Sequence, residues 1–296
     1  MQLEVTLNEL LVLAEGLVMW CGSVCKDWSP MSSQSGFSGK WMPLFGVMIG
    51  LVRLLKPRCF FHENSSKFDS SVFQELLKDL GFQLHHEILD PRDFGMPVRR
   101  PRAWDCILRK DVGLIKELYE LQNFKSPVVL DAGAFALASD EEVAAVKRRM
   151  AMTAMQGISE PFSNLLPPGA MSNLTKYRAL AADLLGRHLE VACNLDQNPE
   201  CMPHWGRQMP VVLASTTNMW LLKQNRPLTA KELLASQGVP IYERLWRLAG
   251  FTAPPVNVSA VKESAVRRMA GNSFNQAVAI SFLMFIMANL RPVEPP

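Results

Sequence analysis

Three stretches of the chain place chemically reactive side chains at the ends of apolar runs. Cys25 follows the apolar run at 17–22 and precedes a polar segment that contains a proline. Glu63 and Asn64 end another apolar run, where a carboxylic acid can act as a proton donor. An arginine-rich turn follows, and a rigid turn of this kind can hold a phosphate or the carbonyl oxygen of a base. Together the three stretches offer a nucleophile, an acid and a cation.

Each stretch also has a purely structural explanation. A free cysteine at a strand end packs as a small hydrophobic residue more often than it acts as a nucleophile. A glutamate such as Glu63 is commonly solvated or caps a helix, and an arginine turn often just faces solvent. The chemical interpretation therefore depends on the three stretches occurring together, and on elements that bring them to one place.

The alternation of apolar and polar residues predicts an α/β fold that positions these stretches. Ser70 or Ser71 can cap one helix-like run, and Gly81 can end it. The expected elements are helices at 3–15, 41–55 and 70–81, strands at 17–22 and 58–63, and a hairpin of strands at 82–91 and 102–110. This order favours a largely parallel sheet with functional groups on the loops at the carboxyl ends of its strands.

The remainder of the chain lacks this rhythm. Residues 113–225 combine mixed helices with proline-containing loops, as an inserted second region would. The most apolar run, at 276–290, is short for a membrane span, so we expect a buried helix and no membrane attachment. Glutamates interrupt the apolar residues at the N-terminus, which is not typical of a signal peptide.

The composition narrows the possible partners and compartments. A net charge of +3 means that any nucleic-acid surface would come from local clusters, such as the basic run at 147–149. Six cysteines lie far apart and often within apolar runs, which predicts a reducing compartment. Cys193, Cys201 and His204 lack the paired spacing of a zinc knuckle, so we expect no metal.

In this order and spacing, the reactive stretches resemble conserved blocks of the cytosine-5 DNA methyltransferase family. The family's catalytic loop, its Glu-Asn strand end and its arginine hairpin are matched here by SVCKDWSPM, HENSSKF and FGMPVRRPRAW. Two later blocks, at 226–240 and 269–279, are similar to the segment that re-enters the catalytic domain and to the final Gly-Asn-Ser block. Five blocks in the family's order are far more specific than any one of them.

The resemblance implies an α/β fold with a partial Rossmann-like methyltransferase sheet and an inserted, irregular target-recognition region. It divides the chain into a catalytic α/β portion at 1–112, a target-recognition-like region at 113–225, and a return segment with a C-terminal helix at 226–296. It implies S-adenosylmethionine as the methyl donor and DNA as the partner, with RNA left open because the ring chemistry is the same. We expect an intracellular protein, nuclear if the source is eukaryotic, and the sequence does not indicate an oligomeric state.

The resemblance also gives each residue a role. Cys25 would add to carbon 6 of a flipped cytosine, so that carbon 5 becomes nucleophilic enough to take a methyl group. Glu63 would hydrogen-bond or protonate N3 of the ring. Arg100 and Arg102 match the family's two arginines, which supply fixed cationic donors. The remaining matched residues are Asn64 and Ser29 as support for the loop, and Asn272 and Ser273 beside the cofactor.

The cofactor half is the part of the family pattern that this sequence lacks. The family places a strand and a glycine-rich loop before the catalytic loop. Here 24 residues precede Cys25, and they contain no glycine-rich segment. The run VVLDAGAF at 128–135 has a single glycine and is expected to be ordinary structure. We therefore expect a divergent or truncated enzyme with an incomplete cofactor site. The alternative is a catalytically inactive methyltransferase-like protein that binds nucleic acid or regulates another protein.

Overall fold

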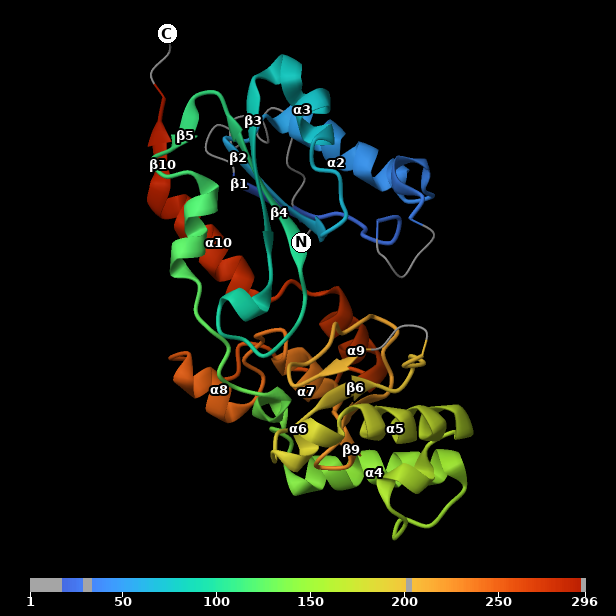
Figure 1. Ribbon diagram of the computed structural model, residues 1–296. Coiled ribbons are helices and arrows are strands. Elements are labelled where there is room, and N and C mark those ends of the chain that lie inside the picture. The colour runs from blue at the N-terminus through green and yellow to red at the C-terminus, as the bar shows by residue number, and fades with distance from the viewer. Residues whose placement is uncertain (1–17, 29–33, 201–203, 294–296) are drawn as a thin grey trace. The chain divides into compact units, whose positions relative to one another are not determined.

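The computed structural model describes residues 18–28, 34–200 and 204–293 and separates into two compact units (Figure 1). Unit 1 consists of Met1–Asp90, Pro101–Lys125 and Ile280–Pro296, and unit 2 of Pro91–Arg100 and Ser126–Ala279. The predicted helix at 3–15 lies outside the described residues, as do Ser29 and Cys201. The division of the chain by function, at 1–112, 113–225 and 226–296, stays a prediction.

Unit 1 is built on a four-stranded sheet with the order β1-β2-β4-β3. The strands are β1 (Val18–Gly22), β2 (Cys59–Ser65), β3 (Phe82–Leu89) and β4 (Arg102–Arg109). Strand β1 is parallel to β2, whereas β4 is antiparallel to both β2 and β3. The predicted hairpin of β3 and β4 is confirmed, but the expectation of a largely parallel sheet is wrong. The reason is that β4 lies between β2 and β3. Strand β4 is therefore antiparallel to both of its neighbours.

Two helices cover one face of this sheet, α2 (Met42–Leu55) and α3 (Val72–Leu77) (Figure 1). Helix α2 buries its apolar residues at i, i+3, i+4 and i+7, which is the spacing of one helical face. Helix α3 is followed by a 3-10 turn, η2 (Lys78–Leu80), and Gly81 then takes the left-handed conformation that ends it, as predicted. The core on this face consists of Phe45, Met48, Ile49, Val52, Phe60, Phe68, Phe73, Leu77, Ala103 and Ile107.

Helix α10 (Gln276–Asn289) contributes Phe282 to the aromatic cluster of unit 1. The Phe282 ring lies 6.4, 5.8 and 5.4 Å from the rings of Trp20, Phe61 and Trp104, respectively. The predicted burial of this run is confirmed for one side only, because Met284 is 67% exposed. By length and composition, the described stretch Glu263–Asn289 is long and apolar enough to cross a bilayer. Core helices of soluble proteins also meet these two criteria.

The other elements of unit 1 are short. Strand β5 (Val112–Leu114) pairs with β10 (Leu290–Pro292), which ties the C-terminal segment to this unit. The remaining 3-10 turns of the unit are η1 (Gly36–Ser38) and η4 (Leu118–Phe124).

Unit 2 has a small antiparallel sheet surrounded by helices, in line with the mixed structure predicted for much of it. The strand order is β7 (Trp205–Gly206), β6 (Ala192–Asn194), β8 (Met219–Leu221) and β9 (Arg226–Pro227). The helices are α4 (Asp140–Ala154), α5 (Pro168–Leu180), α6 (Ala182–Gly186), α7 (Ala230–Ala235), α8 (Glu243–Leu248) and α9 (Glu263–Asn272). The 3-10 turns are η3 (Pro91–Asp93), η5 (Ala132–Phe135) and η6 (Phe162–Leu165).

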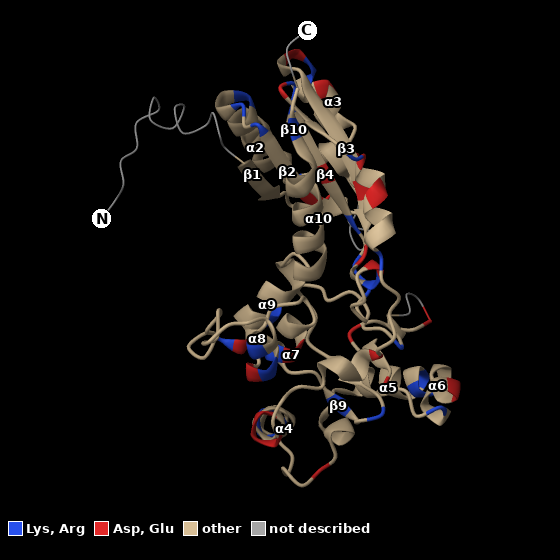
Figure 2. Ribbon diagram, turned by 90° about the vertical axis from the view of Figure 1, so that its left-hand side faces the viewer, with Lys and Arg blue, Asp and Glu red and all other residues tan. Residues whose placement is uncertain are grey.

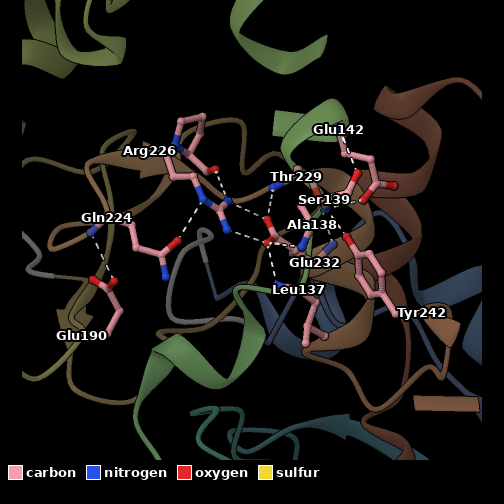
Figure 3. A network of polar contacts seen from close by, with 11 residues as sticks. Leu137, Ala138, Ser139, Glu142, Glu190, Gln224, Arg226, Thr229, Glu232 and Tyr242 are labelled. Carbon is pink, nitrogen blue, oxygen red and sulfur yellow. Dashed lines mark hydrogen bonds and ion pairs between the residues drawn. The ribbon is translucent and has the colours of Figure 1, made fainter. Parts of the chain in front are cut away.

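A buried ion pair between Arg226 and Glu232 organises unit 2 (Figure 3). The guanidinium donates to both carboxylate oxygens, at 2.9 and 2.8 Å, and the Glu232 side chain is fully buried. Glu232 also accepts hydrogen bonds from the backbone of Thr229, Leu137 and Ala138. One carboxylate therefore joins the start of α7 to β9 and to the segment that precedes α4.

We predict that Glu232→Ala destabilises the protein by about 3–5 kcal/mol, because it leaves the buried guanidinium of Arg226 without its partner. The free energy of unfolding in urea measures this change. Glu243→Ala is the control, since Glu243 and Arg247 pair in the exposed helix α8, and it should change the stability little. Equal effects of the two substitutions would contradict the central role of Glu232.

Candidate active site

The loop that carries Cys25 begins directly after β1, and we call residues 23–28 the Cys25 loop. Cys25 is half-buried, and its carbonyl accepts a hydrogen bond from the Trp28 backbone at 3.1 Å, which closes a turn. Asp27 is buried and accepts from the backbone N–H of Trp41, the residue before α2, at 3.1 Å. The Lys26 ammonium lies 5.3 Å from the centroid of the Trp41 ring. The loop is thus anchored to the beginning of α2.

Glu63 and Arg102 form an ion pair at the same end of the sheet. Gly22, the last residue of β1, is opposite Glu63 in the parallel register, so the Cys25 loop leaves the sheet beside this carboxylate. Arg102 is opposite Ser65, which places it diagonally from Glu63 on the same face. The Arg102 Nε and Glu63 Oε1 atoms are 3.2 Å apart, and both side chains are mostly buried. Three of the predicted site residues therefore share one end of one sheet.

Asn64 and Ser65 connect the end of β2 to the Cys25 loop. Asn64 Nδ2 donates to the Ser23 hydroxyl at 2.6 Å, and Asn64 Oδ1 accepts from the Ser65 backbone at 2.6 Å. The Ser65 hydroxyl donates to the carbonyl of Trp28 at 3.1 Å. The two ends of the loop are therefore both held by β2, and Asn64 makes the kind of contact expected of a support residue.

A buried carboxylate and two histidines lie behind this contact. His62 Nδ1 is 2.8 Å from one oxygen of Asp105, and both side chains are fully buried. His86 Nδ1 is 2.7 Å from the other oxygen. Burial raises the pKa of Asp105, but the hydrogen bonds from His62 and His86 outweigh it and hold that pKa below its usual value. The hydrogen bond to Asp105 raises the pKa of His86 above its usual value.

Sequence reasoning gave no role to this cluster. The signal that could have found it is Asp105 itself, a charged residue in the middle of the apolar run of β4. A charge at such a position needs buried partners, and residues on the neighbouring strands are the first place to look for them.

Arg100 has a different environment from Arg102, although the two are separated by one residue. Arg100 belongs to unit 2, is 4% exposed, and donates to three backbone carbonyls. These acceptors are the carbonyl oxygens of Val212 at 3.1 Å, Gly271 at 2.9 Å and Ser273 at 2.9 Å. Its guanidinium therefore holds the segment between α9 and α10, and its catalytic role remains a prediction.

The expected helix start at Gly271, Asn272 and Ser273 is wrong. Helix α9 ends at Asn272, Ser273 follows as its cap, and α10 begins only at Gln276. Gly271 sits at a close approach of two backbones, because a Cβ there would lie 2.2 Å from the Ala214 nitrogen. Asn272 and Ser273 thus lie at a helix C-terminus, without the free N–H groups of a helix start. Their role beside a cofactor remains a prediction.

The segment 128–135 ends in a 3-10 turn, and its residues Val129 and Leu130 are exposed. The last four residues of the segment, Ala132–Phe135, form η5. Asp131 caps this turn, because its side chain accepts a hydrogen bond from the Gly133 backbone at 2.9 Å. The second oxygen of Asp131 accepts from the Glu190 backbone at 2.9 Å, and a Cβ on Gly133 would meet the Glu190 side chain at 3.2 Å. Asp131 thus ties this turn to the backbone that precedes β6.

Basic residues that could meet phosphates share their helix with acidic ones. The basic run at 147–149 lies on α4, whose first turn carries three acidic residues (Figure 2). Arg149 is also paired with Glu263. In the part of the chain that the structure describes, no group of three or more His, Cys, Asp or Glu side chains is arranged to hold a metal.

The comparisons with known proteins point to one family. The family model of the C-5 cytosine-specific DNA methylases matches residues 17–286. Type II methyltransferase M.HaeII of Haemophilus aegyptius is 22% identical over 286 residues, which are 90% of this chain and 79% of that protein. Type II methyltransferase M.HhaI of Haemophilus parahaemolyticus is 27% identical over 136 residues, which are 43% of this chain and only 39% of that relative.

A solved structure gives the same fold. A putative DNA modification methyltransferase encoded within a prophage of E. coli superposes with a TM-score of 0.51 at 14% identity. The superposition covers 92% of this chain and 79% of that one. The predicted α/β, Rossmann-like fold is thereby confirmed.

The neighbouring histidines of β3 predict opposite pH dependences of stability. The pKa of His86 is raised, so its stabilisation is present below about pH 6.5 and is lost as the pH rises through the folded-state pKa. Burial lowers the pKa of His85, so its charged form is disfavoured in the folded state and stability falls as the pH drops below about 6.5.

We therefore expect His86→Gln to reduce the free energy of unfolding more at about pH 5.5 than at about pH 8.5. His85→Gln is the matched control. Its free energy of unfolding, compared with that of the original chain, should be higher at about pH 5.5 than at about pH 8.5. Urea unfolding of both variants at the two pH values measures the effect. A pH-independent loss in His86→Gln would show that its contact with Asp105 carries no charge.

Proposed function

Because this chain belongs to the C-5 cytosine-specific DNA methylase family, we propose that it is a divergent cytosine-5 methyltransferase that activates a flipped cytosine through Cys25. The observation that carries the proposal is the Glu63–Arg102 ion pair beside the exit of the Cys25 loop from β1. A thiolate, an acid and a guanidinium must all reach one flat ring, and these three residues come from the same end of one sheet.

The proposed chemistry starts with attack on the base. The Cys25 thiolate forms a bond to carbon 6 of the cytosine, and the electron pair of the 5,6 double bond moves toward N3. Glu63 stabilises this charge by hydrogen bonding or proton donation at N3. Arg102 fixes the orientation of the Glu63 carboxyl group, for which the rigid guanidinium fork is well suited. The result is an enamine whose carbon 5 is nucleophilic.

This adduct can react without a methyl donor. If carbon 5 takes a proton from water, the ring then loses either that proton or the original hydrogen, and the bond between sulfur and carbon 6 breaks. The net result is exchange of the hydrogen at carbon 5 with solvent, with cytosine and the thiolate regenerated. This exchange reports the action of Cys25 and Glu63 separately from methyl transfer.

We expect the described residues to form an incomplete site for S-adenosylmethionine, the methyl donor of the family. Strand β1 is an edge strand of the described sheet, and a Cβ on Gly133, the one glycine of the segment 128–135, would meet the side chains of Asp131 and Glu190. Asn272 and Ser273 lie at the end of a helix and supply no helix N-terminus for the donor. We therefore propose that this chain carries out the base-activating part of the reaction.

An incomplete cofactor site, as expected from the sequence, favours a second candidate function. A protein that keeps the base pocket without a methyl donor would act as a catalytically inactive, nucleic-acid-binding or regulatory relative of these enzymes. The two functions differ in the exchange reaction, because a regulatory protein would bind nucleic acid without Cys25-dependent exchange. DNA is the proposed partner, and cytosine-containing RNA is the comparison substrate in each assay.

The described cysteines support the proposed location. Cys21, Cys25, Cys59, Cys106 and Cys193 are all free thiols, as expected of a protein in a reducing intracellular compartment. The bacterial relatives lend no support to a nuclear one.

We predict that the isolated chain incorporates no tritiated methyl group from S-adenosylmethionine into DNA, because bringing the two substrates together supplies much of the rate of such reactions. The same chain should release tritium from DNA that contains 5-tritiated cytosine. Cys25→Ser should abolish this release.

Cys21→Ser is the matched control, since Cys21 is also half-buried but lies within β1, and it should release tritium normally. Exchange that persists in Cys25→Ser, or that is absent from the original chain, would contradict the base-activating role and favour the regulatory function.

The acid has its own test. Glu63→Gln should slow the exchange about 100-fold or more, because an amide cannot donate a proton to N3 as the ring is attacked. Glu75→Gln, at an exposed position on α3, is the control and should leave the exchange rate unchanged. An exchange rate in Glu63→Gln equal to that of the control would exclude Glu63 as the acid.

A further inference from the structure

Ser23 has two side-chain contacts that fix the beginning of the Cys25 loop. It is the first residue after β1 and stands two residues before Cys25. Its hydroxyl oxygen is 2.7 Å from His62 Nε2 and 2.6 Å from Asn64 Nδ2. Because side chains alternate along a strand, His62 and Asn64 point to one face of β2 while Glu63 points to the other. The acid and the two contacts of Ser23 therefore use opposite faces of the same strand end.

The chemistry of the groups sets the direction of each hydrogen bond. An ionised Asp105 carboxylate only accepts, so His62 Nδ1 must carry the proton that faces it. In the neutral imidazole, His62 Nε2 is then an acceptor, and the Ser23 hydroxyl donates to it. The Asn64 amide donates to the Ser23 oxygen. With the His62 proton on Nδ1, each of the three hydrogen bonds that link these four side chains therefore has one donor and one acceptor.

We propose that Ser23, His62 and Asp105 are positioning residues that hold the Cys25 loop in its working conformation. The side chains of His62 and Asp105 are fully buried, so the acceptor that they present to Ser23 is fixed in place. Asp105 is itself held by a second histidine, His86, through its other oxygen. The proposal rests on the proposed role of Cys25, and it adds the residues that determine where the thiol lies.

The order Ser23, His62 and Asp105 has the hydrogen-bond connectivity of a catalytic triad, yet the surroundings indicate a holding role. In a triad the histidine takes a proton from a hydroxyl that attacks a substrate. Here the hydroxyl oxygen also accepts a hydrogen bond from Asn64, which draws on the lone pairs that an attack would need. Ser23 is therefore bonded both as donor and as acceptor, which suits an anchor for the loop.

The rate at which iodoacetamide alkylates Cys25 tests the proposal without requiring methyl transfer or exchange. Peptide mass spectrometry separates Cys25 from the other thiols of the full chain. Ser23→Ala removes both hydrogen bonds of the hydroxyl and should raise the Cys25 rate at least about fivefold, which is the effect of one lost hydrogen bond on the opening of the loop. Ser23→Thr keeps the hydroxyl and should stay within about twofold of the original rate. His62→Asn keeps a donor to Asp105 but is too short to reach Ser23, and it should resemble Ser23→Ala.

The other cysteines are internal controls. Cys21 in β1 and the buried Cys59 and Cys106 should keep their rates in every variant, which separates loop opening from loss of the fold. An unchanged Cys25 rate in Ser23→Ala, or an equal increase in Ser23→Thr, would overturn the proposal. If a variant fails to fold, the nitrogen-15 spectrum of the His62 ring in the original chain remains decisive.

That spectrum reports the tautomer directly. We expect neutral His62 to carry its proton on Nδ1, with Nε2 bare, and a proton on Nε2 alone would contradict the assigned hydrogen bonds. These outcomes are independent of the proposed function. Absence of cytosine exchange with the expected alkylation pattern would count against the enzyme, whereas normal exchange with unchanged alkylation would count against the positioning residues alone.

Discussion

The parallel pairing of β1 with β2, with Gly22 opposite Glu63, is the constraint on which the candidate active site depends. It places the exit of the Cys25 loop beside the end of β2. Because side chains alternate, Glu63 then meets Arg102 on one face, while His62 and Asn64 meet Ser23 on the other. A shift of β2 by one residue would exchange these faces and break both sets of contacts. The core under α2 and the rings around Phe282 hold the register from either side.

Much of unit 1 follows from local sequence patterns. Local residue patterns predict the strands β1 and β2, the helix α2 and the turn between β3 and β4. The structure contains each of these elements. The ordered motifs gave the family, which the match over residues 17–286 confirms. The same patterns did not reveal that β4 separates β2 from β3, because strand order depends on contacts between distant segments.

The features that the sequence did not predict all depend on long-range contacts. Arg100 and Arg102 look equivalent in the arginine turn, but one donates to carbonyls more than a hundred residues away and the other pairs with Glu63. Gly271 lies within α9 against the backbone of Ala214, a close approach that no local motif specifies. The cluster around Asp105 joins three strands, and only the charge within an apolar run hints at it.

The central claim is that Cys25 attacks carbon 6 of a cytosine held at this end of the sheet. The most direct test is to incubate the chain with an oligonucleotide that carries 5-azacytosine, whose nitrogen at position 5 makes carbon 6 more open to attack by a thiolate. We expect a covalent complex that survives denaturation and that mass spectrometry maps to Cys25. No covalent complex, or an adduct on a different cysteine, would contradict it.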